Sequence, residues 1–322
     1  MVQPGGGQAR EVAVIITARN AERTAAMAVA SALHQAPARE VVFVDDGSTD
    51  ATAQVAAGAD DGSGRLNIIR LPENRGPSAG RNVAIAASMA PWICILDADD
   101  FMAPGRLAAM FEQAGEDCDL IADDITFCRG PDAASAFDHL LEPGLKLPLD
   151  LNLERFSLGN LPRADRPRRE LGFLKPLMRR EFLAAHGLGY DERLRLGEDF
   201  ILYSACMIAG ARFRLVQACG YCAVQYDDSL SARHRTEDVE RLHAALVELA
   251  RTAAAAGAPL SGLDRVRRHQ RDNLALRRAL DGKRAQGWRG LISAVGASPE
   301  SLPFIVGRIA HDKLAARSPA KV

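Results

Sequence analysis

The sequence predicts an α/β protein in which a mostly parallel sheet is covered by helices on both faces. Three observations lead to this prediction. Short β-branched or aliphatic runs alternate with alanine-rich helical spacing through the first third of the chain. A cluster of polar residues follows each of the first four apolar runs. Beyond Ser231 the composition changes to alanine-rich and arginine-rich helical segments, which predicts a C-terminal helical extension.

The alternation of strands and helices is clearest at the N-terminal end. We expect strands at Val12–Thr17, Val41–Val44, Leu66–Leu71 and Trp92–Leu96, with helices at Asn20–His34, from an N-cap at Ser48 to about Ala57, and at Ser78–Met89. From Asp123 to about Arg169 the periodicity weakens and five prolines interrupt the chain, so we expect loops and short elements there. This segment is a candidate wall for an acceptor groove.

Regular structure is expected again beyond this proline-rich segment. The pattern predicts helices near Arg180–His186 and Asp199–Ala209, a closing hairpin of Phe213–Val216 and Cys219–Tyr226, and C-terminal helices at Glu237–Ala256 and Leu263–Arg284. No repeat of intermediate length is found, so a solenoid is not expected.

Composition argues against several classes of protein. The net charge of −1 gives no overall attraction to nucleic acid or membrane, and the 5% of aromatic residues offers few platforms on which bases could stack. Six scattered cysteines, several inside apolar runs, are typical of reduced core residues in a cytosolic protein. Cys219 and Cys222 form one CxxC in a strand-like setting, which favours packing over a zinc site.

The sequence has neither the signal-peptide pattern nor the long apolar run that would place the protein outside the cytoplasm or in a membrane. Residues 1–10 are glycine-rich and lack the apolar stretch of a signal peptide. The longest nearly apolar run, Phe200–Ala211, is too short to span a bilayer. We therefore expect a cytoplasmic protein without nucleic-acid partners.

The most informative segment is Ile95–Asp100, where an apolar strand runs directly into three aspartates. Carboxylates this close repel one another unless a cation neutralises them. Mg²⁺ or Mn²⁺ held by one or two carboxylates plus substrate phosphates is the usual arrangement. The alternative is a solvated turn, since Asp also favours turns and helix N-caps. The metal interpretation predicts a metal diphosphate as the ligand.

Polar side chains follow all four predicted N-terminal strands, and in such sheets ligands bind beyond the carboxyl ends of the strands. The four clusters are Thr17, Arg19 and Asn20; Asp45 and Asp46; Asn74, Arg75 and Gly76; and Asp97, Asp99 and Asp100. No GxGxxG follows the first strand and no Walker lysine motif is present. Recognition of phosphate must therefore rely on side chains and a metal.

Several of these segments together resemble a known family. They are residues 14–20 (VIITARN), 44–50 (VDDGSTD), 74–76 (NRG), 81–82 (RN) and 96–100 (LDADD). Their ordered co-occurrence resembles the family 2 glycosyltransferases of the GT-A fold. The resemblance is dense over Val12–Arg106 and resumes at Leu174–Leu202.

The resemblance implies a nucleotide-sugar site at the first strand ends. It places Thr17 and Asp46 along the nucleoside pocket, with Asp46 accepting a hydrogen bond from the edge of uracil or another base, and it includes Asn20 in the same site. Arg81 would lie beside the phosphates, where a guanidinium can bind a diphosphate with two hydrogen bonds. From the residues alone, Asp46 could instead be a charge at a helix N-terminus and Arg81 a surface residue.

The resemblance also implies the catalytic groups. Asp97 would face the ribose or the metal, and Asp99 would bind the metal directly, as the DxD pair of the family does. Asp100 is expected to cap the following turn. Glu198 and Asp199 resemble the ED motif of the family, which makes Asp199 the base that accepts the proton of the acceptor hydroxyl. Acidic residues also commonly open helices, so both roles are compatible.

We therefore expect a metal-dependent, inverting glycosyltransferase that uses Mn²⁺ or Mg²⁺ and a UDP-linked sugar. Its acceptor would be a glycan or a polyprenyl-linked glycan in bacterial exopolysaccharide or cell-surface polysaccharide synthesis. Residues 226–234 (YDDSLSARH) resemble the exopolysaccharide-type members. One rival is a sugar nucleotidyltransferase, which needs a glycine-rich phosphate loop where this chain has Thr17–Asn20. The other is a catalytically degenerate GT-A scaffold protein.

The expected domains are a GT-A catalytic domain at residues 1–230 and the helical extension at residues 231–322. The nucleotide-binding half covers about 12–122 and the acceptor half about 123–230. Residues 162–180 hold seven basic and two acidic residues, which predicts contact with an anionic acceptor or with the inner membrane face, unless the segment is a solvated loop. Residues 263–284 form a second basic stretch, and a homodimer through the extension is left open.

Overall fold

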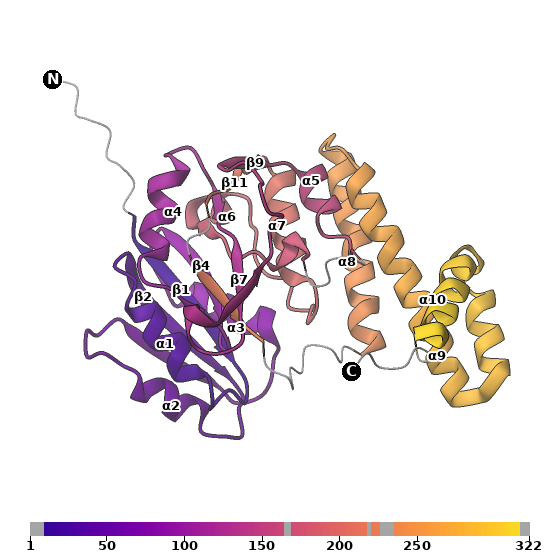
Figure 1. Ribbon diagram of the computed structural model, residues 1–322, viewed down its shortest axis with the longest axis horizontal. Coiled ribbons are helices and arrows are strands. Elements are labelled where there is room, and N and C mark those ends of the chain that lie inside the picture. Colours follow the sequence, from indigo (N-terminus) through magenta and orange to yellow (C-terminus); the bar gives the residue numbers. More distant parts are fainter. Residues whose placement is uncertain (1–9, 164–168, 218–219, 226–234, 316–322) are drawn as a thin grey trace.

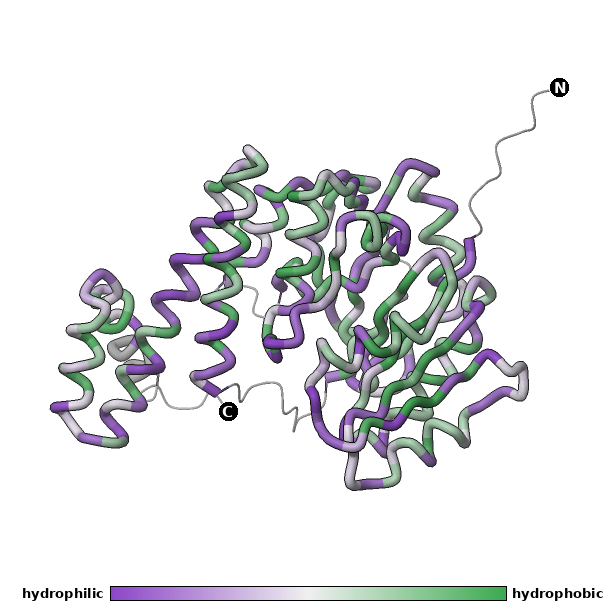
Figure 2. Tube along the Cα trace, turned by 180° about the vertical axis from the view of Figure 1, so that it is seen from behind, coloured by the Kyte–Doolittle hydropathy of each residue, from purple (hydrophilic) through white to green (hydrophobic). Residues whose placement is uncertain are grey.

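The computed structural model describes residues 10–163, 169–217, 220–225 and 235–315, with side chains up to residue 308. A large sheet of eight strands forms the centre, a small sheet of four strands lies beside it, and the C-terminal helices lie at one end of the molecule (Figure 1). The buried apolar residues of both sheets and their flanking helices form the core, and Figure 2 shows the central strands as the most hydrophobic part of the trace.

The large sheet has the strand order β3-β2-β1-β4-β10-β6-β11-β9. Its strands are β1 (Val12–Ala18), β2 (Ala38–Asp46), β3 (Leu66–Leu71), β4 (Trp92–Asp97), β6 (Leu120–Ala122), β9 (Leu149–Leu151), β10 (Leu177–Arg179) and β11 (Phe213–Leu215). The first four strands are parallel, whereas β10 runs antiparallel to both of its neighbours. The predicted mostly parallel sheet is therefore confirmed.

The small sheet has the order β5-β12-β7-β8. Its strands are β5 (Phe101–Met102), β7 (Ile125–Cys128), β8 (Ala136–His139) and β12 (Tyr221–Val224). The helices are α1 (Ala25–Leu33), α2 (Thr52–Gly58), α3 (Pro77–Ala86), α4 (Arg106–Ala114), α5 (Leu153–Leu158), α6 (Arg180–Ala185), α7 (Glu198–Ile208), α8 (Thr236–Ala255), α9 (Ser261–Gly296) and α10 (Leu302–Ala315), with 3₁₀ turns η1 (Ala133–Ser135), η2 (Leu171–Phe173) and η4 (Pro299–Ser301).

Two of the N-terminal helices begin later than the sequence predicts. Asn20, expected to open α1, has a positive φ of 52°, and its side-chain oxygen accepts a hydrogen bond from the Thr49 amide at 3.0 Å. Ser48, expected to cap α2, instead accepts a hydrogen bond from the Asn20 amide at 2.9 Å. The loops after β1 and β2 therefore bind each other, and each helix starts after this contact. Near the start of α2, Asp50 accepts a hydrogen bond from the amide of Thr52.

The predicted closing hairpin is wrong. β11 pairs with β6 and β9 in the large sheet, whereas β12 pairs with β5 and β7 in the small sheet. The described part of β12 is attached to the end of β4, because Asp100 accepts hydrogen bonds from the Tyr221 hydroxyl at 2.8 Å and the Val224 amide at 3.0 Å. Asp100 thus joins the two sheets and does not cap the next turn. Cys219 lies outside the described residues, so the CxxC is described only at Cys222, which is buried.

The first C-terminal helix has the predicted length, whereas the second is longer than predicted. α9 continues to Gly296 across a break at Gly287, whose φ of 64° is non-helical, and α10 was not predicted. α8 packs against α7, and α9 packs against α5 and α8, so these helices are attached to the sheet-bearing part of the chain (Figure 1). No helix in the described part of the chain is both long enough and apolar enough to cross a lipid bilayer.

Candidate active site

The register of the large sheet brings the predicted polar clusters to one edge. Thr17, near the end of β1, lies opposite Asp97 at the end of β4 and opposite Val44 of β2. α3 lies close to this edge, since a Cβ built on Gly80 would meet Thr17 Cγ2 at 2.9 Å. The side chains at the carboxyl ends of the neighbouring strands β2, β1 and β4 and at the start of α3 therefore lie in one region. The carboxyl ends of parallel strands meet at one edge of a sheet, where ligands bind.

Asp46 lies at the end of β2 and is only 4% exposed. Its carboxylate accepts hydrogen bonds from the Asn74 side chain at 2.6 Å, the Arg75 amide at 2.7 Å and the Gly76 amide at 2.8 Å. These bonds hold the 74–76 loop against the strand end. A carboxylate has about four lone-pair positions, so one position remains for a further donor. Asp45, its buried neighbour, accepts the Ser48 amide at 2.9 Å.

The residues predicted to act on phosphate and acceptor lie together. Arg81 of α3 is 4% exposed, and its guanidinium contacts Asp97 at 3.1 Å, Glu198 at 2.8 Å and Asp199 at 3.3 Å. Asp97 comes from β4, whereas Glu198 and Asp199 open α7. Burial acts to lower the pKa of Arg81, but the neighbouring carboxylates outweigh it, and the pKa stays well above its usual value. The arginine is therefore a permanent cation between two groups of acids.

Lys175 is a second buried cation that the sequence analysis assigned to a surface patch. Its ammonium contacts Asp199 at 2.8 Å and Asp97 at 3.0 Å. Burial acts to lower the pKa of this ammonium, but Asp199 and Asp97 raise it above its ordinary value. Lys175 and Arg81 thus bridge the carboxylate at the end of β4 to the carboxylate at the start of α7. In the sequence, the only signal for Lys175 is its position within Leu174–Leu202, where the resemblance to the family resumes.

Asp99 is exposed, whereas Asp97 is half-buried and Asp100 is buried. Desolvation by nearby protein atoms, and then the Asp97 charge, raise the pKa of the Asp99 carboxyl. Among the described residues no group of three His, Cys, Asp or Glu side chains is arranged to hold a metal. The oxygens of Asp97 and Asp99 nevertheless suit Mg²⁺ or Mn²⁺, which commonly take only one or two carboxylates when substrate phosphates supply other ligands. The residues therefore fit a cation that arrives with a diphosphate.

A cavity of about 350 Å³ adjoins this cluster. Its lining includes Arg81, Asp97, Lys175 and Asp199, together with residues of η2, α8 and α9. The carboxylates predicted for the metal side and the acceptor side, Asp97 and Asp199, therefore share one cavity.

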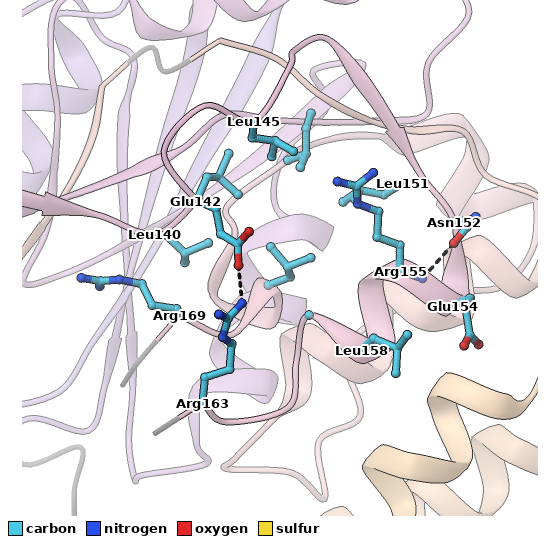
Figure 3. Close-up of a pocket in the computed structure, with 14 residues that line it drawn as sticks. Leu140, Glu142, Leu145, Leu151, Asn152, Glu154, Arg155, Leu158, Arg163 and Arg169 are labelled. Atoms are coloured by element: carbon cyan, nitrogen blue, oxygen red, sulfur yellow. Dashed lines mark hydrogen bonds and ion pairs between the residues drawn. The ribbon is translucent and has the colours of Figure 1, made fainter. Parts of the chain in front are cut away.

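A second cavity of about 510 Å³ has seven leucines among its fourteen lining residues (Figure 3). Residues 158–163 and 169–173 form the wall between the two cavities. The catalytic side of this wall carries Asn160, Pro162, Glu170, Gly172 and Phe173, and the other side carries Leu158, Gly159, Arg163, Arg169 and Leu171. Asp97, Arg81, Lys175 and Asp199 line only the first cavity.

The expected basic patch at residues 162–180 is not a continuous free surface in the described residues. Lys175 is buried in the catalytic cluster, Arg163 pairs with Glu142, and Arg169 pairs with Asp138. Arg179 and Arg180 donate to backbone carbonyls beside β4 and β6. Arg166 and Arg168 lie outside the described residues. Each described basic side chain of this segment has a partner within the chain.

Comparison with known proteins agrees with this geometry. Residues 13–165 match the family described as Glycosyl transferase family 2. The chain is 47% identical to the succinoglycan biosynthesis protein ExoU of Rhizobium meliloti, over 94% of this chain and 88% of that protein.

Two solved structures share the fold at low identity. The crystal structure of S. aureus TarS in complex with UDP-GlcNAc superposes with a TM-score of 0.55 at 17% identity, covering 90% of this chain and 92% of that one. Mannosyltransferase PcManGT from Pyrobaculum calidifontis, in complex with GDP-Man and Mn²⁺, gives a TM-score of 0.51 at 18% identity, covering 96% and 81%. The chain belongs to glycosyltransferase family 2 and has a GT-A-like fold.

Proposed function

We propose that this glycosyltransferase inverts the anomeric centre of a UDP-linked sugar and transfers it to a glycan or polyprenyl-linked glycan during bacterial exopolysaccharide synthesis. The observation that carries the proposal is the shared cavity, in which Asp97 of β4 and Asp199 of α7 are bridged by Arg81 and Lys175. The 47% identity to the succinoglycan biosynthesis protein ExoU supports the polysaccharide class.

On the donor side, the two buried cations are the groups that meet a diphosphate. Arg81 and Lys175 both contact Asp97, so an arriving diphosphate can take over these contacts without leaving either cation unpaired. Asp99, which is exposed, and Asp97 would hold Mn²⁺ or Mg²⁺. When bound, that ion would offset charge on the departing diphosphate as a Lewis acid.

On the acceptor side, Asp199 is the proposed base. Its two carboxylate oxygens contact Arg81 at 3.3 Å and Lys175 at 2.8 Å. Transfer of these cations to a bound diphosphate would free an oxygen of Asp199. This oxygen would accept the proton of the acceptor hydroxyl while the hydroxyl oxygen attacks the anomeric carbon and UDP leaves. Binding of the donor would therefore release the base from its two cations.

The nucleoside would lie against the ends of β1 and β2. Thr17 lies beside α3, and Asp46 keeps one acceptor position after binding the 74–76 loop. Asn20 shapes the same edge by joining the first two loops, since its side chain accepts the Thr49 amide. We propose that Asp46 accepts a hydrogen bond from the base while also fixing the loop.

The C-terminal helices would contact a lipid-linked acceptor or an anionic membrane face. Trp288 and Ile292 are one helical turn apart on α9 and are 67% and 70% exposed. Lys283 lies over the Trp288 ring at 4.9 Å, and residues 263–284 are strongly basic. Exposed aromatic and aliphatic residues beside basic ones are typical of helices that rest on anionic lipid.

The decisive experiment incubates the protein with UDP-sugars, with and without Mn²⁺. The proposal expects metal-dependent UDP binding by calorimetry and slow release of UDP and free sugar in the absence of acceptor. Formation of UDP-sugar from UTP and a sugar phosphate would instead support the nucleotidyltransferase. Failure to bind UDP at any metal concentration would support the degenerate scaffold.

A further inference from the structure

The C-terminal helices contribute directly to the catalytic cavity. Gln270 and His269 of α9 and Leu242 of α8 line it together with Asp199. We propose, resting on the function above, that the part of the cavity between η2 and α9 binds a sugar ring of the acceptor, and that Gln270 is one of its recognition residues.

The polar lining of this part suits sugar hydroxyls. Among the residues that the structure describes, no group donates a hydrogen bond to the buried carboxylate atom Oε2 of Glu170, and buried polar atoms are normally paired. Asn160 accepts the Gly172 amide at 3.0 Å through its oxygen, which leaves its NH₂ group as a donor. The half-buried Gln270 offers both a donor and an acceptor. Hydroxyl groups, which donate and accept at once, satisfy such a mixed set.

An aromatic ring completes the lining. Phe173, the last residue of η2, lines the cavity and is 47% exposed. A large aromatic side chain normally buries its faces, so an exposed ring at a cavity is available for a ligand. The C–H face of a pyranose ring is apolar and flat, and it can cover a phenyl ring while its hydroxyls reach the polar groups. An acceptor sugar therefore fits this lining better than a lipid chain, which would leave the polar groups unpaired.

The helices that carry this lining are held firmly against the catalytic residues. Gly197 has a φ of +73° and directly precedes Glu198 and Asp199, and a Cβ built on it would lie 2.8 Å from Leu242 Cδ1. α8 therefore packs against the turn that positions the proposed base. At the start of α9, the Gly262 amide donates to Glu154 Oε2 of α5 at 2.6 Å. These contacts fix α9 relative to Asp199, so Gln270 can serve as a positioned recognition residue.

The test measures acceptor binding separately from donor binding. The probes are octyl β-D-glucoside and octyl β-D-galactoside, added to the full chain with UDP and Mn²⁺ and followed by saturation-transfer NMR. We expect at least one probe to bind, and its dissociation constant to rise about fivefold in Gln270→Ala and about tenfold in Phe173→Ala, from the loss of a hydrogen bond and a ring contact. Gln286→Ala on α9 and Phe137→Ala on β8, which do not line the cavity, are matched controls.

Each outcome decides the proposal. UDP affinity measured by calorimetry is expected to be the same in all four variants, which separates this site from the donor site. The proposal is overturned if neither glycoside shows saturation transfer with the unaltered protein, or if Gln270→Ala and Phe173→Ala bind the probe as the controls do. If the unaltered protein binds a glycoside but not UDP, the subsite stands and the proposed donor chemistry fails.

Discussion

Replacing Asp199 with Asn isolates the proposed base with little change of shape. The buried cluster holds two cations, Arg81 and Lys175, and three carboxylates, Asp97, Glu198 and Asp199, so its formal charge is −1. Asp199→Asn brings the formal charge to zero and leaves an amide oxygen that can still accept the Lys175 hydrogen bond. The fold should therefore persist, and binding of an anionic donor should be retained or strengthened.

The Asp199→Asn substitution is expected to slow the chemical step. General-base catalysis typically contributes about 10²- to 10⁴-fold, so kcat for transfer should fall by that factor, which corresponds to a barrier increase of about 3–5 kcal/mol. The assay measures UDP release in the presence of acceptor, alongside calorimetric titration with UDP and Mn²⁺. Glu142→Gln, a carboxylate paired with Arg163 outside the catalytic cavity, is a matched control. Turnover of Asp199→Asn near that of the unaltered protein would refute the assignment of the base.

Three further predictions concern other parts of the molecule. Asp99→Ala should abolish the Mn²⁺ stimulation of UDP binding seen by calorimetry. Asp117→Ala should not, because Asp117 lies before β6, is 84% exposed at its side chain and does not line the catalytic cavity; equal stimulation in both variants would remove Asp99 from the metal site. Asp46→Ala should lower the free energy of unfolding by about 2–4 kcal/mol in urea titration, because three donors, of which the Gly76 amide is buried, lose their acceptor; a change below 1 kcal/mol would contradict this. Trp288→Ser with Ile292→Ser should reduce sedimentation with phosphatidylglycerol vesicles without altering UDP binding, and unchanged sedimentation would exclude this membrane contact.

The N-terminal half of the fold could be predicted from the sequence because its signals are local. Val12–Ala18 is a nearly continuous apolar strand buried on both faces, and each of the first three parallel strands along the chain is followed by a helix. The strand-end polar residues then follow from the topology alone. Asp97 and Asp199 could be paired only through the family resemblance, since more than 100 residues separate them and no local pattern links β4 to α7.

The remaining features depend on contacts between distant segments. The small sheet is built from strands of two to four residues, too short to show periodicity, and its attachment depends on Asp100 meeting Tyr221 across more than 100 residues. In the sequence, Lys175 is one of seven basic residues within residues 162–180. Only the three-dimensional structure shows it buried between Asp97 and Asp199. The approach of Gln270 to the cavity likewise follows from packing of α9 against α5, which no sequence pattern encodes.

The central claim is that one donor site lies between the carboxylates of β4 and α7. A crystal structure of the protein with UDP and Mn²⁺ tests it most directly. The claim predicts Mn²⁺ at about 2.1 Å from an Asp99 oxygen and from the diphosphate, with Arg81 and Lys175 turned toward the phosphates and an Asp199 oxygen released. UDP bound elsewhere, or bound here with both cations still on Asp97 and Asp199, would contradict it.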